Sequence, residues 1–121
     1  MAFRILVVDD SRLARTLVKN ALAAAGFEVV GEAANGRQAA DMYFQLRPDV
    51  VTMDVIMPDM DGPAAAREIL GKEPRARIIM VTSLNQQTIE EEMKQVGVRS
   101  VLTKPFEPSA LVDSIQAAMA A

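Results

Sequence analysis

The chain has 121 residues, of which 50% are hydrophobic and 24% are charged, a balance typical of one globular domain with a sizeable core. It contains no histidine, cysteine or tryptophan, which excludes the usual neutral-pH base, metal sites built on imidazole or thiolate, and disulfide bonds. A net charge of −3 and an aromatic content of 4% make nucleic acid and anionic membranes poor primary partners.

Short apolar runs alternate with amphipathic segments along the chain. In chain order the sequence predicts a strand at Phe3–Val8, a helix at Leu13–Ala25, a strand at Phe27–Ala33, a helix introduced by Asn35–Gly36 and ended by Pro48, a strand at Asp49–Met53, a helix between Pro63 and Gly71, a strand at Arg77–Val81, a helix at Ile89–Val96, a strand at Ser100–Thr103 and a helix from Pro108 to Met119.

This order predicts the fold class. Five strands alternate with five helices, at spacings suited to right-handed crossovers between parallel strands. The strands are apolar nearly throughout, which indicates a parallel sheet covered by helices on both faces. We therefore expect an α/β protein with a doubly wound three-layer sandwich.

The N-terminal segment does not have the pattern of an export signal. The apolar run Ile5–Val8 stops after four residues at Asp9, and no apolar stretch in the sequence is long enough to span a bilayer. With no cysteine in the chain, we expect a cytoplasmic protein without a membrane partner.

Polar residues follow four of the five predicted strands directly. They are Asp9 and Asp10, then Asp54, then Thr82 and finally Lys104. The carboxyl ends of parallel strands meet at one edge of the sheet, where doubly wound proteins bind their ligands. Each residue alone also suits a helix cap, a turn or a solvated loop. Their convergence on one edge indicates a functional site.

The residue types restrict the chemistry of that site. Three aspartates in contact repel one another, and one of them takes up a proton unless a cation intervenes. Without histidine or cysteine the fitting cation is hard and oxygen-seeking, and Mg²⁺ fits best. A carboxylate beside Mg²⁺ and a lysine can act as a nucleophile toward a phosphoryl group, which gives an aspartyl phosphate.

At these residues the sequence resembles the response-regulator receiver domain of two-component signalling, over essentially its whole length. The matching segments are Val7–Ser11, Met53–Gly62, Val81–Ser83 and Leu102–Phe106. The resemblance implies one receiver domain over residues 1–121, with a flavodoxin-like (βα)5 fold and the strand order 2-1-3-4-5. In length the chain is similar to the single-domain, CheY-like members that act in chemotaxis.

The resemblance also implies a role for each residue at the predicted edge. Asp54 is the phospho-acceptor, and the cofactor Mg²⁺ is held by Asp10 directly and by Asp9 through a bound water. Asp54 itself and the backbone carbonyl of Ile56 complete the protein's share of the metal ligands.

Thr82 and Lys104 are expected to contact the transferred phosphoryl group, and the peptide bond Lys104–Pro105 is expected to be cis. By the same resemblance the phosphodonor is a sensor histidine kinase. The chain then catalyses only its own phosphorylation and dephosphorylation, as a signalling protein and not as an enzyme acting on other substrates.

An output partner is expected on the face formed by the fourth helix, the fifth strand and the fifth helix, with the chain as a monomer or a phosphorylation-promoted dimer. Family members usually carry an aromatic residue three positions before the lysine, where this sequence has Val101. Because valine is stiff and short, coupling of phosphorylation to that face is expected to change.

Other functions remain open from the residues alone. A degenerate receiver that docks proteins without phosphorylation is the main alternative. A flavodoxin-like cofactor binder would need a phosphate cradle where Asp9 and Asp10 stand. An aspartyl-phosphate phosphatase would carry an acid two residues after its nucleophile, where this chain has Ile56.

Overall fold

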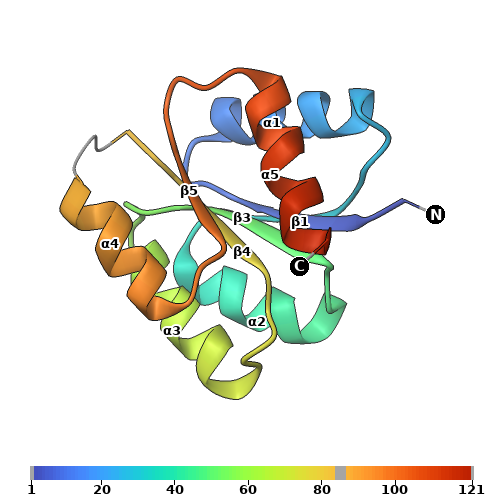
Figure 1. The fold of residues 1–121 in the computed structure, drawn as a ribbon. Coiled ribbons are helices and arrows are strands. Elements are labelled where there is room, and N and C mark those ends of the chain that lie inside the picture. The colour runs from blue at the N-terminus through green and yellow to red at the C-terminus, as the bar shows by residue number, and fades with distance from the viewer. Residues whose placement is uncertain (1, 84–86, 121) are drawn as a thin grey trace.

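The computed structural model describes residues 2–83 and 87–120 and contains a five-stranded parallel sheet between two layers of helices (Figure 1). The strand order is β2-β1-β3-β4-β5, as the resemblance predicted. The elements are β1 Arg4–Val8, α1 Arg12–Ala24, β2 Glu28–Ala33, α2 Gly36–Leu46, β3 Val50–Asp54, α3 Gly62–Lys72, β4 Ile78–Thr82, α4 Gln87–Val96, β5 Ser100–Thr103 and α5 Pro108–Ala120.

Local side-chain hydrogen bonds set the starts of three helices. The side chains of Ser11, Asn35 and Asp61 each accept a hydrogen bond from a backbone N–H in the first turn of α1, α2 and α3. Gly26 and Gly97 have positive φ angles of 88° and 111° after α1 and α4, a conformation that suits glycine. These residues account for the agreement between the predicted and observed helix ends.

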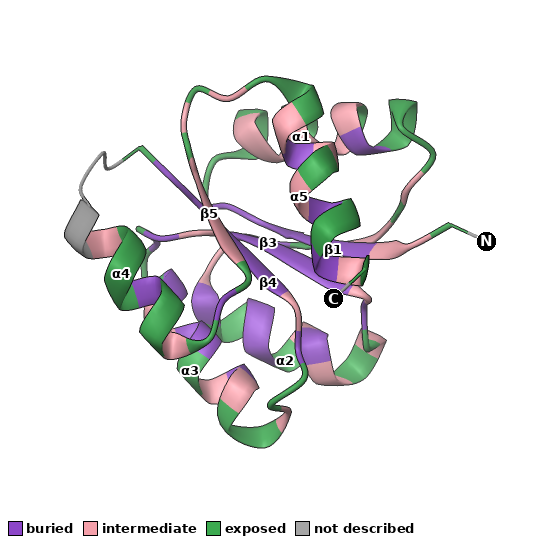
Figure 2. Cartoon of the chain, in the orientation of Figure 1, coloured by how far each residue is buried: buried purple, intermediate pink, exposed green. Residues whose placement is uncertain are grey.

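The sheet separates two apolar cores. In Figure 1, α1 and α5 cover one face and α2, α3 and α4 cover the other. Figure 2 shows β1, β3 and β4 buried along most of their length. Leu22 of α1 and Leu111 of α5 are fully buried in the smaller core, while Leu13 and Leu17 are 70% and 61% exposed. The apolar stripe of α1 is thus wider than its buried face.

The register of the strands brings their carboxyl ends to one level. Val8 lies beside Met53, Asp54 beside Val81, and Thr82 beside Thr103. The residues that follow β1, β3, β4 and β5 therefore emerge at the same edge of the sheet. Among the described residues, no helix is long and apolar enough to cross a membrane.

Two of the three leucines of α1, Leu22 and Leu17, provide a test of this packing. Leu22→Ala leaves a cavity in the core between α1, α5 and the sheet, so the free energy of unfolding should fall by about 2–5 kcal/mol. Leu17→Ala removes an exposed side chain and should change it by less than about 0.5 kcal/mol. Urea denaturation of the two variants measures both values, and equal losses would contradict the assigned burial.

Candidate functional site

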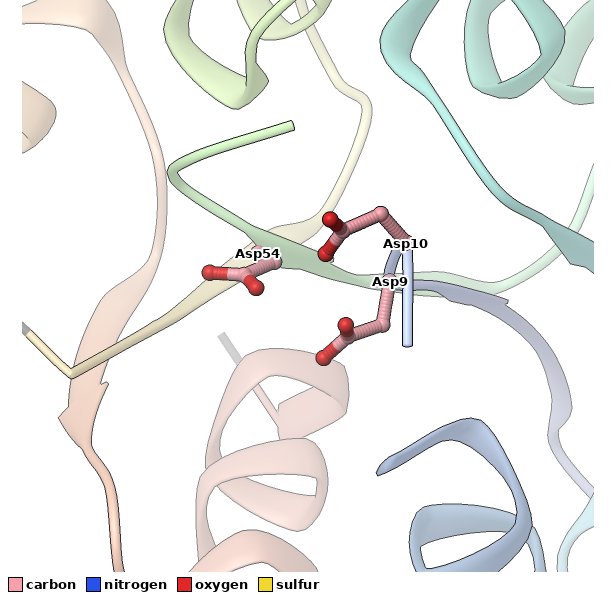
Figure 3. A group of neighbouring side chains, drawn as sticks. All are labelled: Asp9, Asp10 and Asp54. Carbon is pink, nitrogen blue, oxygen red and sulfur yellow. The ribbon is translucent and has the colours of Figure 1, made fainter. Parts of the chain in front are cut away.

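Three carboxylates meet at the edge formed by the ends of β1 and β3. Asp9 and Asp10 follow β1, Asp54 ends β3, and one oxygen from each lies within 4.8 Å of the others (Figure 3). Asp9 is buried, Asp54 is half-buried and Asp10 is exposed. The cluster therefore has a closed side toward the sheet and an open side toward solvent.

One ammonium group bridges two of these carboxylates. Lys104 Nζ donates to Asp9 Oδ2 at 2.8 Å and to Asp54 Oδ2 at 3.3 Å. The Lys104 backbone N–H donates to the carbonyl of Thr82 at 2.7 Å, which ties the loop after β5 to the end of β4. The peptide bond Lys104–Pro105 is cis, as expected from the resemblance.

Burial and charge shift the proton affinities at this edge. Burial is the main cause that raises the pKa of Asp54, and the neighbouring Asp9 charge raises it further, against the opposing charge of Lys104. Burial alone would lower the pKa of Lys104, but its hydrogen bond to Asp9 and the charge of Asp54 raise it overall. Lys104 is thus held as a cation between two acids.

The remaining predicted residues lie at the same edge. Thr82 is the last residue of β4 and is 1% exposed. A hydrogen bond from the backbone of Ile56 to Asp54 lowers the pKa of that carboxyl in part, so the backbone of Ile56 borders the acidic cluster. The Ile56 side chain is 58% exposed and lies at the rim. The six residues singled out in the sequence therefore share one edge of the sheet.

The donor atoms fit a magnesium ion. Asp9, Asp10 and Asp54 offer three carboxylates, while Lys104 supplies one positive charge, so the ionised cluster keeps an excess of negative charge. All of the donors are hard oxygens, which Mg²⁺ prefers, and the exposed position of Asp10 leaves room for the waters that this ion retains. The number and type of these donors therefore fit a divalent cation.

Arg15 supports the cluster from α1, and nothing in the sequence marked it. Its Nη1 donates to the backbone carbonyl of Asp9 at 2.7 Å, and its Nε contacts Glu32 at 3.1 Å. Asp9 Oδ1 also accepts from the Ser11 backbone N–H at 2.9 Å. Arg15 stands one turn into α1, beside the strand that carries Glu32, and only knowledge of the β1–β2 pairing would have suggested this contact.

Comparisons with known proteins agree with this geometry. The family model described as response regulator receiver domain matches residues 5–116. A chemotaxis protein CheY of Thermotoga maritima is 42% identical over 115 residues, which are 95% of this chain and 96% of the relative.

Two solved structures share the fold closely. The response regulator domain of Thermotoga maritima CheB is 34% identical, with a TM-score of 0.93 over 100% of this chain and 98% of the other. CheY in the CheX-CheY-BeF3-Mg complex from Borrelia burgdorferi is 26% identical, with a TM-score of 0.92 over 95% and 87% of the two chains. From its sequence, its fold and these relatives, the chain belongs to the response regulator receiver family.

Proposed function

We propose that the chain is a phosphorylation switch that accepts a phosphoryl group from the phosphohistidine of a sensor histidine kinase onto Asp54, in a Mg²⁺-dependent reaction. The observation that carries the proposal is the meeting of Asp9, Asp10, Asp54 and Lys104 at one edge of the sheet. Receiver domains are signalling proteins, and the relative from Thermotoga maritima is a chemotaxis protein. The expected cytoplasmic location and oligomeric state stay predictions.

The reaction needs no protein base. An ionised Asp54 oxygen attacks the phosphorus atom, the new O–P bond forms as the N–P bond of the donor breaks, and the leaving imidazole keeps the electron pair of that bond. Lys104 Nζ lies 3.3 Å from Asp54 and would offset charge on the transferred oxygens, and the Thr82 hydroxyl, from the end of the neighbouring strand, would donate to one of them. Bound Mg²⁺ would be held by Asp10, Asp54, the Ile56 carbonyl and, through water, Asp9, and would neutralise further charge there.

Mass spectrometry after incubation with acetyl phosphate tests this reaction. The wild-type chain should gain one phosphoryl group when Mg²⁺ is present and none when the metal is chelated. Asp54→Ala should remove the gain, whereas Asp113→Asn, an exposed change on α5, should retain it. Labelling that persists in Asp54→Ala, or that does not require Mg²⁺, would refute the proposal and favour the docking-module alternative.

The protonation of Asp54 has a consequence for stability in metal-free buffer. Because the pKa of Asp54 is raised in the fold, folding favours the protonated acid. The ionised form that is present at neutral pH therefore lowers the free energy of unfolding. Asp54→Asn removes that cost and should be more stable than the wild type at neutral pH. As the pH falls through the raised pKa toward the ordinary value of 3.8, the wild type protonates and the difference should shrink.

Thermal unfolding of both proteins across this pH range measures the effect. Asp113→Asn removes an exposed carboxylate and serves as the control for the loss of one negative charge. If Asp54→Asn had the same stability as the wild type at neutral pH, the assigned cost of the buried charge would be wrong.

An apolar groove beside the site suits the histidine-bearing donor. Leu17 and Val18 of α1 form one wall, and Pro105 and Phe106 after β5 form the other, with Lys104 shared by the groove and the acidic cluster. A phosphohistidine must bring its phosphorus to Asp54, so the donor covers the surface next to Lys104. The exposed Leu17 of α1 then becomes a contact of the donor.

Leu17→Asp separates donor docking from chemistry. Phosphorylation by the cognate kinase should slow roughly tenfold, which corresponds to about 1.4 kcal/mol of lost contact. Phosphorylation by acetyl phosphate should be unchanged, because the small donor needs no docking surface. Asn20→Asp adds the same charge at an exposed position of the same helix, outside the groove. It should leave the phosphorylation rates with both donors unchanged. An equal loss with both donors would place the defect in the site itself.

The output partner is proposed to bind the face of α4, β5 and α5. Val101 is partly buried and packs against the larger core, where a longer aromatic side chain is usual in the family. Its short, stiff side chain offers no second position that would report the state of Thr82. We therefore propose that the change on this face depends on the segment after Thr82, of which residues 84–86 lie outside the described part of the chain.

A further inference from the structure

The loop between β3 and α3 determines where the Ile56 carbonyl lies. This loop, residues 55–61, begins directly after Asp54 and ends at the start of α3. At its base the Gly62 N–H donates to the Val55 carbonyl at 2.9 Å, and the Val55 N–H donates to the Val81 carbonyl at 3.2 Å. The base of the loop is therefore fixed to the sheet by backbone hydrogen bonds.

The far end of the loop adopts a backbone conformation that needs support. The Met60 N–H donates to the Pro58 carbonyl at 2.8 Å across Asp59, whose φ is +66°. A three-residue turn with positive φ at a non-glycine residue is uncommon and costs about 1–3 kcal/mol. Such a turn persists only where its surroundings hold it.

The N-terminus of α2 holds this turn in place by hydrogen bonds. The Gly36 N–H donates to the Met60 carbonyl at 2.8 Å, and Asn35 Nδ2 contacts Asp59 Oδ2 at 3.4 Å. Asn35 also caps α2, because its Oδ1 accepts from the Gln38 N–H at 2.8 Å. The loop is thus tied to a helix end that is itself fixed by its own cap.

Only glycine permits this close approach. A Cβ atom at residue 36 would lie 2.2 Å from the Met60 carbonyl oxygen and 2.9 Å from the Asp61 carbonyl oxygen. Both are backbone atoms, so no side-chain rotation relieves the clash, and the loop itself would have to move. By contrast, a Cβ atom at Gly71 in α3 would meet nothing within 4 Å.

We propose that Gly36 is a positioning residue for the metal site, which it serves from α2 without touching the metal. Its contact with Met60 fixes the far end of the loop and thereby the position of the Ile56 carbonyl relative to Asp54. This inference rests on the proposed function, in which that carbonyl binds Mg²⁺.

Gly36→Ala tests the inference, with Gly71→Ala as the matched control. The dissociation constant for Mg²⁺, measured by calorimetry below the unfolding transition, should rise roughly tenfold in Gly36→Ala, the size typical of lost support around a metal ligand. Gly71→Ala should bind Mg²⁺ like the wild type. Thermal unfolding measures stability separately, so a change in metal affinity is distinguished from a loss of folded protein.

Amide hydrogen exchange in the wild type tests the same coupling without a substitution. Mg²⁺ should slow exchange of the Gly36 N–H, because the metal orders the loop that accepts its hydrogen bond. The Gly97 N–H donates to the carbonyls of Met93 and Lys94 in α4 and not to the loop, so its exchange should be the same with and without Mg²⁺. The inference would be overturned if Gly36→Ala bound Mg²⁺ with the wild-type affinity, or if the Gly36 amide exchanged at the same rate with and without Mg²⁺. A wild type that binds no Mg²⁺ would instead refute the proposed function.

Discussion

Repulsion among three carboxylates is the constraint on which this structure depends. One oxygen each of Asp9, Asp10 and Asp54 lies within 4.8 Å of the others at one edge, and Lys104 compensates only part of their charge. Burial makes the ionised form of Asp54 costly, so an added divalent cation would lower the free energy of the site more than that of an exposed acidic patch. A phosphoryl group on Asp54 would add negative charge, which the Lys104 ammonium and the divalent cation together would offset.

The fold meets this constraint through backbone geometry. Parallel strands in register deliver the ends of β1, β3 and β4 to one level, so residues far apart in the sequence converge without long side chains. The supports also act on backbone carbonyls: the Arg15 side chain donates to the carbonyl of Asp9, and the Gly36 N–H donates to the carbonyl of Met60. The acids are therefore held by fixed groups, which suits the proposed binding of a metal in one arrangement.

Most of the fold, and the meeting of Asp9, Asp10 and Asp54 at one edge of the sheet, were predictable from the sequence. Continuous apolar runs such as Ile78–Val81 mark buried parallel strands, and Gly26 marks a helix end by its conformation. The exposure of Leu13 and Leu17 was not predictable, because an apolar stripe does not show how much of itself another element covers. The positioning role of Gly36 was not predictable either, since it depends on how near Met60 comes in the folded chain.

The most direct measurement is a crystal structure of the wild-type chain with beryllofluoride and Mg²⁺. The beryllium should bond to Asp54, with the metal contacting Asp10, Asp54 and the Ile56 carbonyl, and with Lys104 and Thr82 on the fluorine atoms. Beryllofluoride on another carboxylate, or an ordered adduct on Asp54 with no metal beside it, would contradict the assignment of this edge as a Mg²⁺-dependent phosphorylation site.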